Sequence, residues 1–144
     1  YCASAIPAPG PTTALEEGLR RASQEVRLRA ESALERWEIG NSLNILWEYV
    51  RQANQYIEQS EPWRLARQPE QVERLNTVLY SAAEAMRLLA LFLSPYIPSA
   101  SNRILAQLGL PPIEHGAWVE QGIWGSVALN RVEPGPLLFP RVEM

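Results

Sequence analysis

The 144-residue sequence contains no lysine and no aspartate, and it has one cysteine and one histidine. Because Cys2 stands alone, neither an internal disulfide nor a zinc cluster is available. No apolar run approaches the ~20 residues that a membrane-spanning helix needs, so we expect no membrane partner. The 13 basic and 16 acidic residues leave a net charge of −3. This balance argues against a domain that grips nucleic acid by bulk electrostatics, but it leaves room for a local contact.

Signatures of catalysis are also missing. There is no glycine-rich phosphate loop, no HExxH and no GxSxG. The only histidine, His115, lies in the loop-like string PPIEHGAW, and a catalytic base would need a nucleophile and an orienting partner beside it. We interpret it as a solvated loop residue. Pairs such as Glu16 with Arg20 and Glu70 with Arg74 have the i,i+4 spacing of surface ion pairs. We therefore predict no catalytic residue and no metal site within this chain.

The residues that are present predict an all-α protein. Thr13 followed by Glu16 has the spacing of a capping box and indicates where the first helix begins. Further helices are expected over about 41–59, 69–94 and 98–108, ended by the proline or glycine that follows each. The expected core-facing positions, spaced by threes and fours, are Leu15, Leu19, Ala22, Val26, Ala30, Ala33 and Trp37; Leu43, Leu46, Val50, Ala53 and Ile57; and Val72, Leu75, Leu79, Ala82, Met86, Leu89 and Leu93.

Short connections between these helices favour an antiparallel helix bundle. We divide the chain into a proline-rich arm over 1–13, a helical bundle over 14–110 and an irregular C-terminal tail over 111–144. The tail has no sustained periodicity, and Ser126–Asn130 resembles a strand. We expect the tail to pack back on the bundle through Trp118, Trp124 and Leu137-Leu138-Phe139. The chain begins with Tyr1 rather than methionine, and we expect it to be a fragment of a longer protein.

The most suggestive group of side chains lies within residues 51–67. Arginines, aromatic rings and an amide are what single-stranded bases use for stacking and for recognition of their edges. Each residue also has a structural interpretation, because an asparagine can cap or bridge helices, a tyrosine can be half-buried and a tryptophan can plug a helix junction. The group consists of Arg51, Asn54, Tyr56, Trp63, Arg64 and Arg67.

Three ordered blocks resemble the anticodon-binding domain of bacterial methionyl-tRNA synthetases. ANQYIEQSEPWRLAR at 53–67 is similar to the family's A/M-N-x-Y-I/V-[DE]-x-x-x-P-W-x-L/V-A-K/R stretch. MRLLALFLSPYIPSASNRILAQLGL at 86–110 is similar to its helix, proline corner and next helix, and PLLFPRVE at 136–143 is similar to its closing motif. The blocks cover most of residues 41–144.

The resemblance implies a bundle of the class I synthetase anticodon-binding type, whose partners are a methionine-specific tRNA and the catalytic domain of the same cytoplasmic enzyme. It implies that Trp63 stacks on an anticodon base, with Arg64 and Arg67 beside it. The family's opening helix, with its asparagine–arginine pair, is absent from this sequence. Its ATP-handling signatures and zinc-knuckle cysteines are absent too. We therefore expect no cofactor in this chain, and we assign ATP and zinc to the missing catalytic domain. Asn54 matches the motif but lies beside the core stripe, so we interpret it as structural.

Two alternatives remain at this stage. The same bundle serves related class I synthetases for leucine, isoleucine, valine and cysteine. The second alternative is a helical protein–protein interaction module, which a contiguous exposed apolar patch would favour. A tRNA-binding module would instead show Trp63 on a partly open surface beside arginines.

Overall fold

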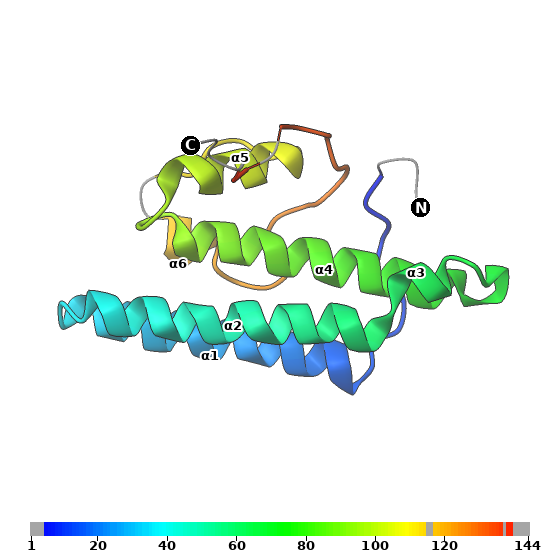
Figure 1. The fold of residues 1–144 in the computed structure, drawn as a ribbon, viewed down its shortest axis with the longest axis horizontal. Coiled ribbons are helices and arrows are strands. Elements are labelled where there is room, and N and C mark those ends of the chain that lie inside the picture. Colours follow the sequence, from blue (N-terminus) through cyan, green and yellow to red (C-terminus); the bar gives the residue numbers. More distant parts are fainter. Residues whose placement is uncertain (1–4, 115–116, 137, 140–144) are drawn as a thin grey trace, which may run out of the picture.

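The chain folds as an all-α antiparallel bundle with an irregular C-terminal tail (Figure 1). The computed structural model describes residues 5–114, 117–136 and 138–139. None of the helices in these ranges combines the length and apolar character needed to cross a membrane. The elements in chain order are α1 (Ala14–Glu35), α2 (Ile39–Ser60), α3 (Pro62–Leu65), the 3-10 turn η1 (Pro69–Gln71), α4 (Val72–Leu93), α5 (Pro98–Gln107) and α6 (Ala117–Gln121).

Helix α4 lies at the centre of the molecule. Figure 1 shows α1 and α2 as an antiparallel pair along one side of α4, and α5 along the other side. The tail contacts both sides, because Arg27 of α1 donates to the Trp118 carbonyl oxygen at 3.2 Å and Arg103 of α5 donates to the Leu138 carbonyl oxygen at 3.1 Å. The core is built where α1, α2 and α4 meet. Its most deeply buried apolar members are Val26, Ala30, Ala33, Leu46, Tyr49, Val78, Ala85, Leu88, Leu91 and Phe92.

Local sequence signals explain where the helices begin and end. The predicted capping box is formed, because the Glu16 carboxylate accepts the Thr13 backbone N–H at 2.7 Å. Pro98 occupies the first turn of α5, a position where its missing N–H costs nothing. Gly109 follows the end of α5 with φ +70°, the left-handed conformation that glycine adopts most easily. The four long helices therefore occupy the predicted parts of the chain, with ends shifted by a few residues.

The predicted apolar faces are only partly correct. On α4, Val72 and Met86 are exposed and Leu79 is half-buried, whereas Val78 and Leu88 are fully buried. The reason is that α4 has neighbours on two sides, so its buried residues occupy more than one stripe. On α1 the predicted face is correct in its central part, and only its end positions Leu15 and Trp37 are exposed. On α2 the buried face also includes Ile45 and Tyr49, and the predicted core residue Leu43 is exposed.

The tail packs on the bundle largely through the tryptophans that were predicted to hold it. The Trp118 indole N–H donates to the Leu91 carbonyl oxygen at 2.9 Å. The Trp118 and Phe92 rings pack edge to face, with their centroids 5.2 Å apart. Trp124 also packs against the core. Phe139 is 71% exposed, so its predicted docking is wrong. Leu137 lies outside the described residues, as does His115.

The tail contains no strand among its described residues, so the strand-like interpretation of Ser126–Asn130 is wrong. A short helix, α6, precedes this stretch, and the only pairing in the described part is an isolated bridge between Ala5 and Arg131. The N-terminal arm thus lies against the tail, where the Ile6 N–H donates to the Asn130 carbonyl oxygen at 2.8 Å.

A buried ion pair joins α4 to the tail. Arg87 and Glu84 have side chains 2% and 0% exposed, and two hydrogen bonds of 2.9 and 2.6 Å connect them. The same guanidinium donates to the carbonyl oxygens of Gln121 at 2.7 Å and Ile123 at 3.0 Å. The Gly125 N–H donates to Glu84 at 2.7 Å. The prediction that the glutamates form a solvated surface therefore fails at this position.

Candidate nucleic-acid interface

The chain turns sharply where α2 ends, and we call residues 61–71 the α3 corner. Glu61 adopts the left-handed conformation with φ 46° and ψ 57°, and its N–H donates to the Ile57 carbonyl oxygen at 3.1 Å. Pro62 follows, and a residue before proline is disfavoured in the helical conformation. The Glu61 carbonyl oxygen then accepts the N–H groups of Arg64 and Leu65, which starts α3. The proline thus both stops one helix and begins the next.

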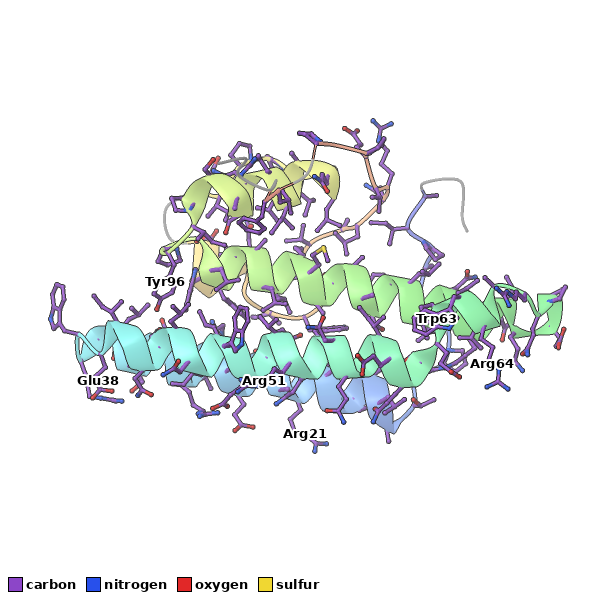
Figure 2. All side chains as sticks on the ribbon, in the orientation of Figure 1. Arg21, Glu38, Arg51, Trp63, Arg64 and Tyr96 are labelled. Atoms are coloured by element: carbon purple, nitrogen blue, oxygen red, sulfur yellow. The ribbon has the colours of Figure 1, made fainter. Side chains whose placement is uncertain are left out.

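This turn places Trp63 at the surface. Its side chain is 47% exposed, whereas Leu65 of the same short helix packs against the core. Arg64 and Arg67 are both exposed. Figure 2 shows Trp63 and Arg64 together at one end of the bundle. Trp63 therefore does not plug a helix junction, and it lies on a partly open surface near arginines.

Arg64 carries a charge that is available to a ligand. Its guanidinium contacts the Glu61 carboxylate at 3.2 Å, with side chains 68% and 45% exposed. An ion pair this exposed contributes little, at most about 1 kcal/mol. Arg64 can therefore exchange Glu61 for a phosphate at small cost.

A depression of about 250 Å³ opens beside α3. It is lined mainly by polar side chains, which present amide, carboxylate and guanidinium groups, and Leu65 supplies its apolar wall. Such groups can form hydrogen bonds to the edges of a nucleobase. The lining residues are Ser60, Glu61, Arg64, Leu65, Gln68 and Gln71.

The other members of the predicted group do not join this surface. Arg51 lies nine residues before the end of α2, which at 1.5 Å per residue places it about 13 Å away along the helix axis (Figure 2). Tyr56 is buried, more deeply than the half-buried position considered for it. Asn54 is exposed, so the structural role suggested by its place beside the core stripe is not supported.

Behind the α3 corner lies a buried carboxylate that the sequence predicted only as a helix cap and as a surface ion-pair partner. Glu16 is 2% exposed. One of its oxygens accepts the Tyr56 hydroxyl at 2.6 Å and contacts the Arg74 guanidinium at 2.8 Å. The other accepts both the N–H and the hydroxyl of Thr13 at 2.7 Å. The predicted i,i+4 pairing of Glu16 with Arg20 is therefore wrong, and Arg74 pairs with Glu16 rather than with Glu70.

The surroundings of Glu16 keep it ionised. Burial alone would raise its pKa, but the hydrogen bonds from Arg74, Tyr56 and Thr13 outweigh this effect and lower the pKa from 4.5 to about 2. Burial together with the hydrogen bond to Glu16 raises the pKa of the Tyr56 hydroxyl. The Glu16 carboxylate raises the pKa of Arg74. No sequence signal linked Glu16 to Tyr56 or Arg74, because the three lie on different helices.

A row of exposed apolar side chains lies at the opposite end of α2. Ile39, Leu43 and Trp47 are spaced by four residues and share one face of that helix, and Trp37 precedes them with a positive φ. This is the kind of feature that a protein–protein module would present. The α3 corner and this row of apolar side chains are thus two different exposed surfaces.

Comparisons with known proteins show which family the chain resembles. The family model for the anticodon binding domain of methionyl tRNA ligase matches residues 6–140. The methionine–tRNA ligase of Bacillus subtilis is 31% identical over 134 residues, which make up 93% of this chain and 20% of that ligase. The ligase of Deinococcus radiodurans is 33% identical over 144 residues, covering 99% of this chain and 21% of its own length. The chain spans about a fifth of the length of these curated relatives.

Solved structures share the fold. The Mycobacterium tuberculosis methionyl-tRNA synthetase in complex with methionyl-adenylate matches with a TM-score of 0.86 and 22% sequence identity. The match covers 97% of this chain and 28% of that chain. The apo form of the same synthetase matches with a TM-score of 0.84 over 98% of this chain. The chain thus shares the fold of these synthetases over nearly its whole length.

Proposed function

Because the chain belongs to the family of anticodon-binding domains of methionyl-tRNA ligases, we propose that it binds the anticodon of a methionine-specific tRNA. We assign this binding to the surface formed by Trp63, Arg64 and Arg67. The observation that carries the assignment is the 47% exposure of Trp63 on a one-turn helix at the end of the bundle.

Each part of the α3 corner has a chemical task in this proposal. The Trp63 ring offers a flat face on which an unpaired anticodon base stacks. Such stacking contributes roughly 1–3 kcal/mol per base. Arg64 and Arg67 supply positive charge for the flanking phosphates. The polar depression beside α3 accepts the edge of the stacked base, with Gln68 and Gln71 as its amide groups.

We propose that the remaining steps of tRNA charging take place outside this chain. Its relatives are ligases about five times longer, which leaves ample length for a catalytic domain. The described residues contain no group of three His, Cys, Asp or Glu side chains that could hold a metal ion. We assign ATP and any zinc to the catalytic domain of a ligase that acts in the cytoplasm. The net charge of −3 implies that this chain alone binds tRNA weakly.

The test is Trp63→Ala in a complete ligase that carries this domain. Loss of a stacked base worth about 1–3 kcal/mol lowers kcat/KM for tRNA charging by about 5- to 150-fold. Methionine-dependent exchange of pyrophosphate into ATP is expected at the rate of the unmodified ligase. Trp63→Phe keeps an aromatic face and is expected to retain part of the charging activity.

Trp37→Ala is the matched control, because it removes another exposed tryptophan at the far end of α2. We expect it to leave tRNA charging unchanged. Unaltered charging by Trp63→Ala would refute the stacking role. A large loss of thermal stability accompanied by normal charging at low temperature would refute it equally.

A further inference from the structure

We propose that Glu16, Tyr56 and Arg74 form a clamp that orients the α3 corner, so that Arg74 acts on tRNA binding as a positioning residue. This inference rests on the proposed function of Trp63. It assigns a role in anticodon recognition to residues that do not touch the RNA. The clamp lies at the two places where the α3 corner joins the bundle.

The α3 corner is attached to the bundle at the end of α2 and at the beginning of α4. Tyr56 lies in the penultimate turn of α2, and Arg74 lies in the first turn of α4. Both side chains bind the same carboxylate oxygen of Glu16, at 2.6 and 2.8 Å. Glu16 itself is held by the N–H and the hydroxyl of Thr13 at the start of α1. One buried carboxylate therefore holds both attachment points of the corner against a third helix.

The direction of Trp63 depends on these attachment points. Helix α3 has a single turn, and α4 is the long helix it packs against, with Leu65 as its apolar contact with the core. The Trp63 ring is half exposed, so the core does not hold it in place. A relative shift of α2 and α4 would therefore turn the ring and the two arginines together. A displacement of about 1 Å at a binding site can cost up to about 100-fold in rate.

The chemistry of the clamp suits orientation better than stability. Burying an ion pair carries a desolvation cost, and apolar side chains of similar volume often stabilise a fold at least as well. Hydrogen bonds from a hydroxyl and a guanidinium are directional, whereas apolar contacts allow neighbouring helices to slide. The three partners come from three helices, which is the arrangement needed to fix a crossing in space.

The experiment uses the complete ligase with Arg74→Met. We expect KM for tRNA to rise about 3- to 10-fold with little change in kcat, because a misdirected surface weakens binding but not chemistry. Pyrophosphate exchange with methionine and ATP stays at its normal rate. Tyr56→Phe keeps the buried ring and removes only the hydroxyl, and it gives a smaller rise in the same direction. Arg29→Met is the control, because it removes an exposed 2.9 Å ion pair with Glu48 elsewhere on the α1–α2 pair; it leaves KM unchanged.

A double variant separates positioning from general damage. If Arg74 acts by directing the α3 corner, then Arg74→Met raises KM for tRNA by a smaller factor in a ligase that already carries Trp63→Ala than in the unmodified ligase. If the KM of the double variant instead rises by the product of the two single increases, the proposed clamp is refuted. An unchanged KM for tRNA in a folded Arg74→Met ligase would also refute the clamp. If Trp63→Ala still lowers kcat/KM for tRNA charging in that case, the proposed function is retained. If Arg74→Met fails to fold, the same two measurements are made with Tyr56→Phe: the rise in KM for tRNA, and its size in the presence of Trp63→Ala.

Discussion

Replacing Arg87 by methionine removes the cation of the most deeply buried ion pair in the described part of the chain. The variant loses two hydrogen bonds to Glu84 and one each to the carbonyl oxygens of Gln121 and Ile123. Glu84, which is 0% exposed, keeps the Gly125 N–H as its partner. Removing one partner of a buried pair costs about 3–5 kcal/mol, since the remaining charge is buried without compensation. That is a large fraction of the ~5–15 kcal/mol that stabilises a typical domain.

The assay is urea unfolding of the 144-residue chain, followed by circular dichroism and by tryptophan fluorescence. We expect Arg87→Met to lower the free energy of unfolding by about 3–5 kcal/mol. Adding Glu84→Gln should recover a substantial part of this loss, because the double variant buries no charge. Arg29→Met, which breaks an exposed pair, should lower the same free energy by at most about 1 kcal/mol. Equal losses for Arg87→Met and Arg29→Met would refute the reasoning, and so would a double variant less stable than Arg87→Met.

Two further predictions concern stability. The pKa of Glu16 is lowered from 4.5 to about 2, so the stabilisation from its ionised form is present above pH ~5 and is lost as the pH falls towards 2. The lowering of the pKa corresponds to about 3 kcal/mol in the free energy of unfolding. Urea midpoints measured from pH 7 to pH 2.5 should therefore fall less steeply for Glu16→Gln than for the unmodified chain, and parallel curves would contradict this. Leu88→Ala should lower the free energy of unfolding by about 2–5 kcal/mol, because the Leu88 side chain is fully buried. Met86→Ala should lower it by less than about 1 kcal/mol, because 49% of Met86 is exposed. Similar losses in urea unfolding would show that the buried side of α4 is misassigned.

Features determined by neighbouring residues could be predicted from the sequence. Thr13 with Glu16 marks the start of α1, and Gly109 marks the end of α5, because capping depends on groups within one turn of the helix end. Pro62 likewise predicts the sharp corner, and the exposure of Trp63 follows from that corner. These signals needed no knowledge of which helices are neighbours.

Features that depend on distant partners could not be predicted. Periodicity shows that α4 is apolar, but Met86 and Leu88 differ in burial because of where α2, α5 and the tail lie. Glu16 binds Tyr56 and Arg74 on other helices, and Arg87 binds the carbonyl oxygens of Gln121 and Ile123. These partners lie at sequence separations that spacing rules do not reach. The role of Trp63 was assigned by resemblance to the family, and Arg64 and Arg67 were chosen because they flank it; the contact of all three with tRNA stays a prediction.

The connection of α4 to the tail has a consequence for the order in which the protein forms during its synthesis. Glu84 and Arg87 leave the ribosome before the backbone groups they bind, which lie 34 to 41 residues further along the chain. At ~5–20 residues per second, the ribosome needs roughly 2–8 s to make that stretch. During this interval both charges are hydrated, so the side of α4 that later lies under the tail stays wetted. A nascent chain that already holds α1, α2 and α4 thereby avoids exposing a continuous apolar surface while it waits for residues 121–125.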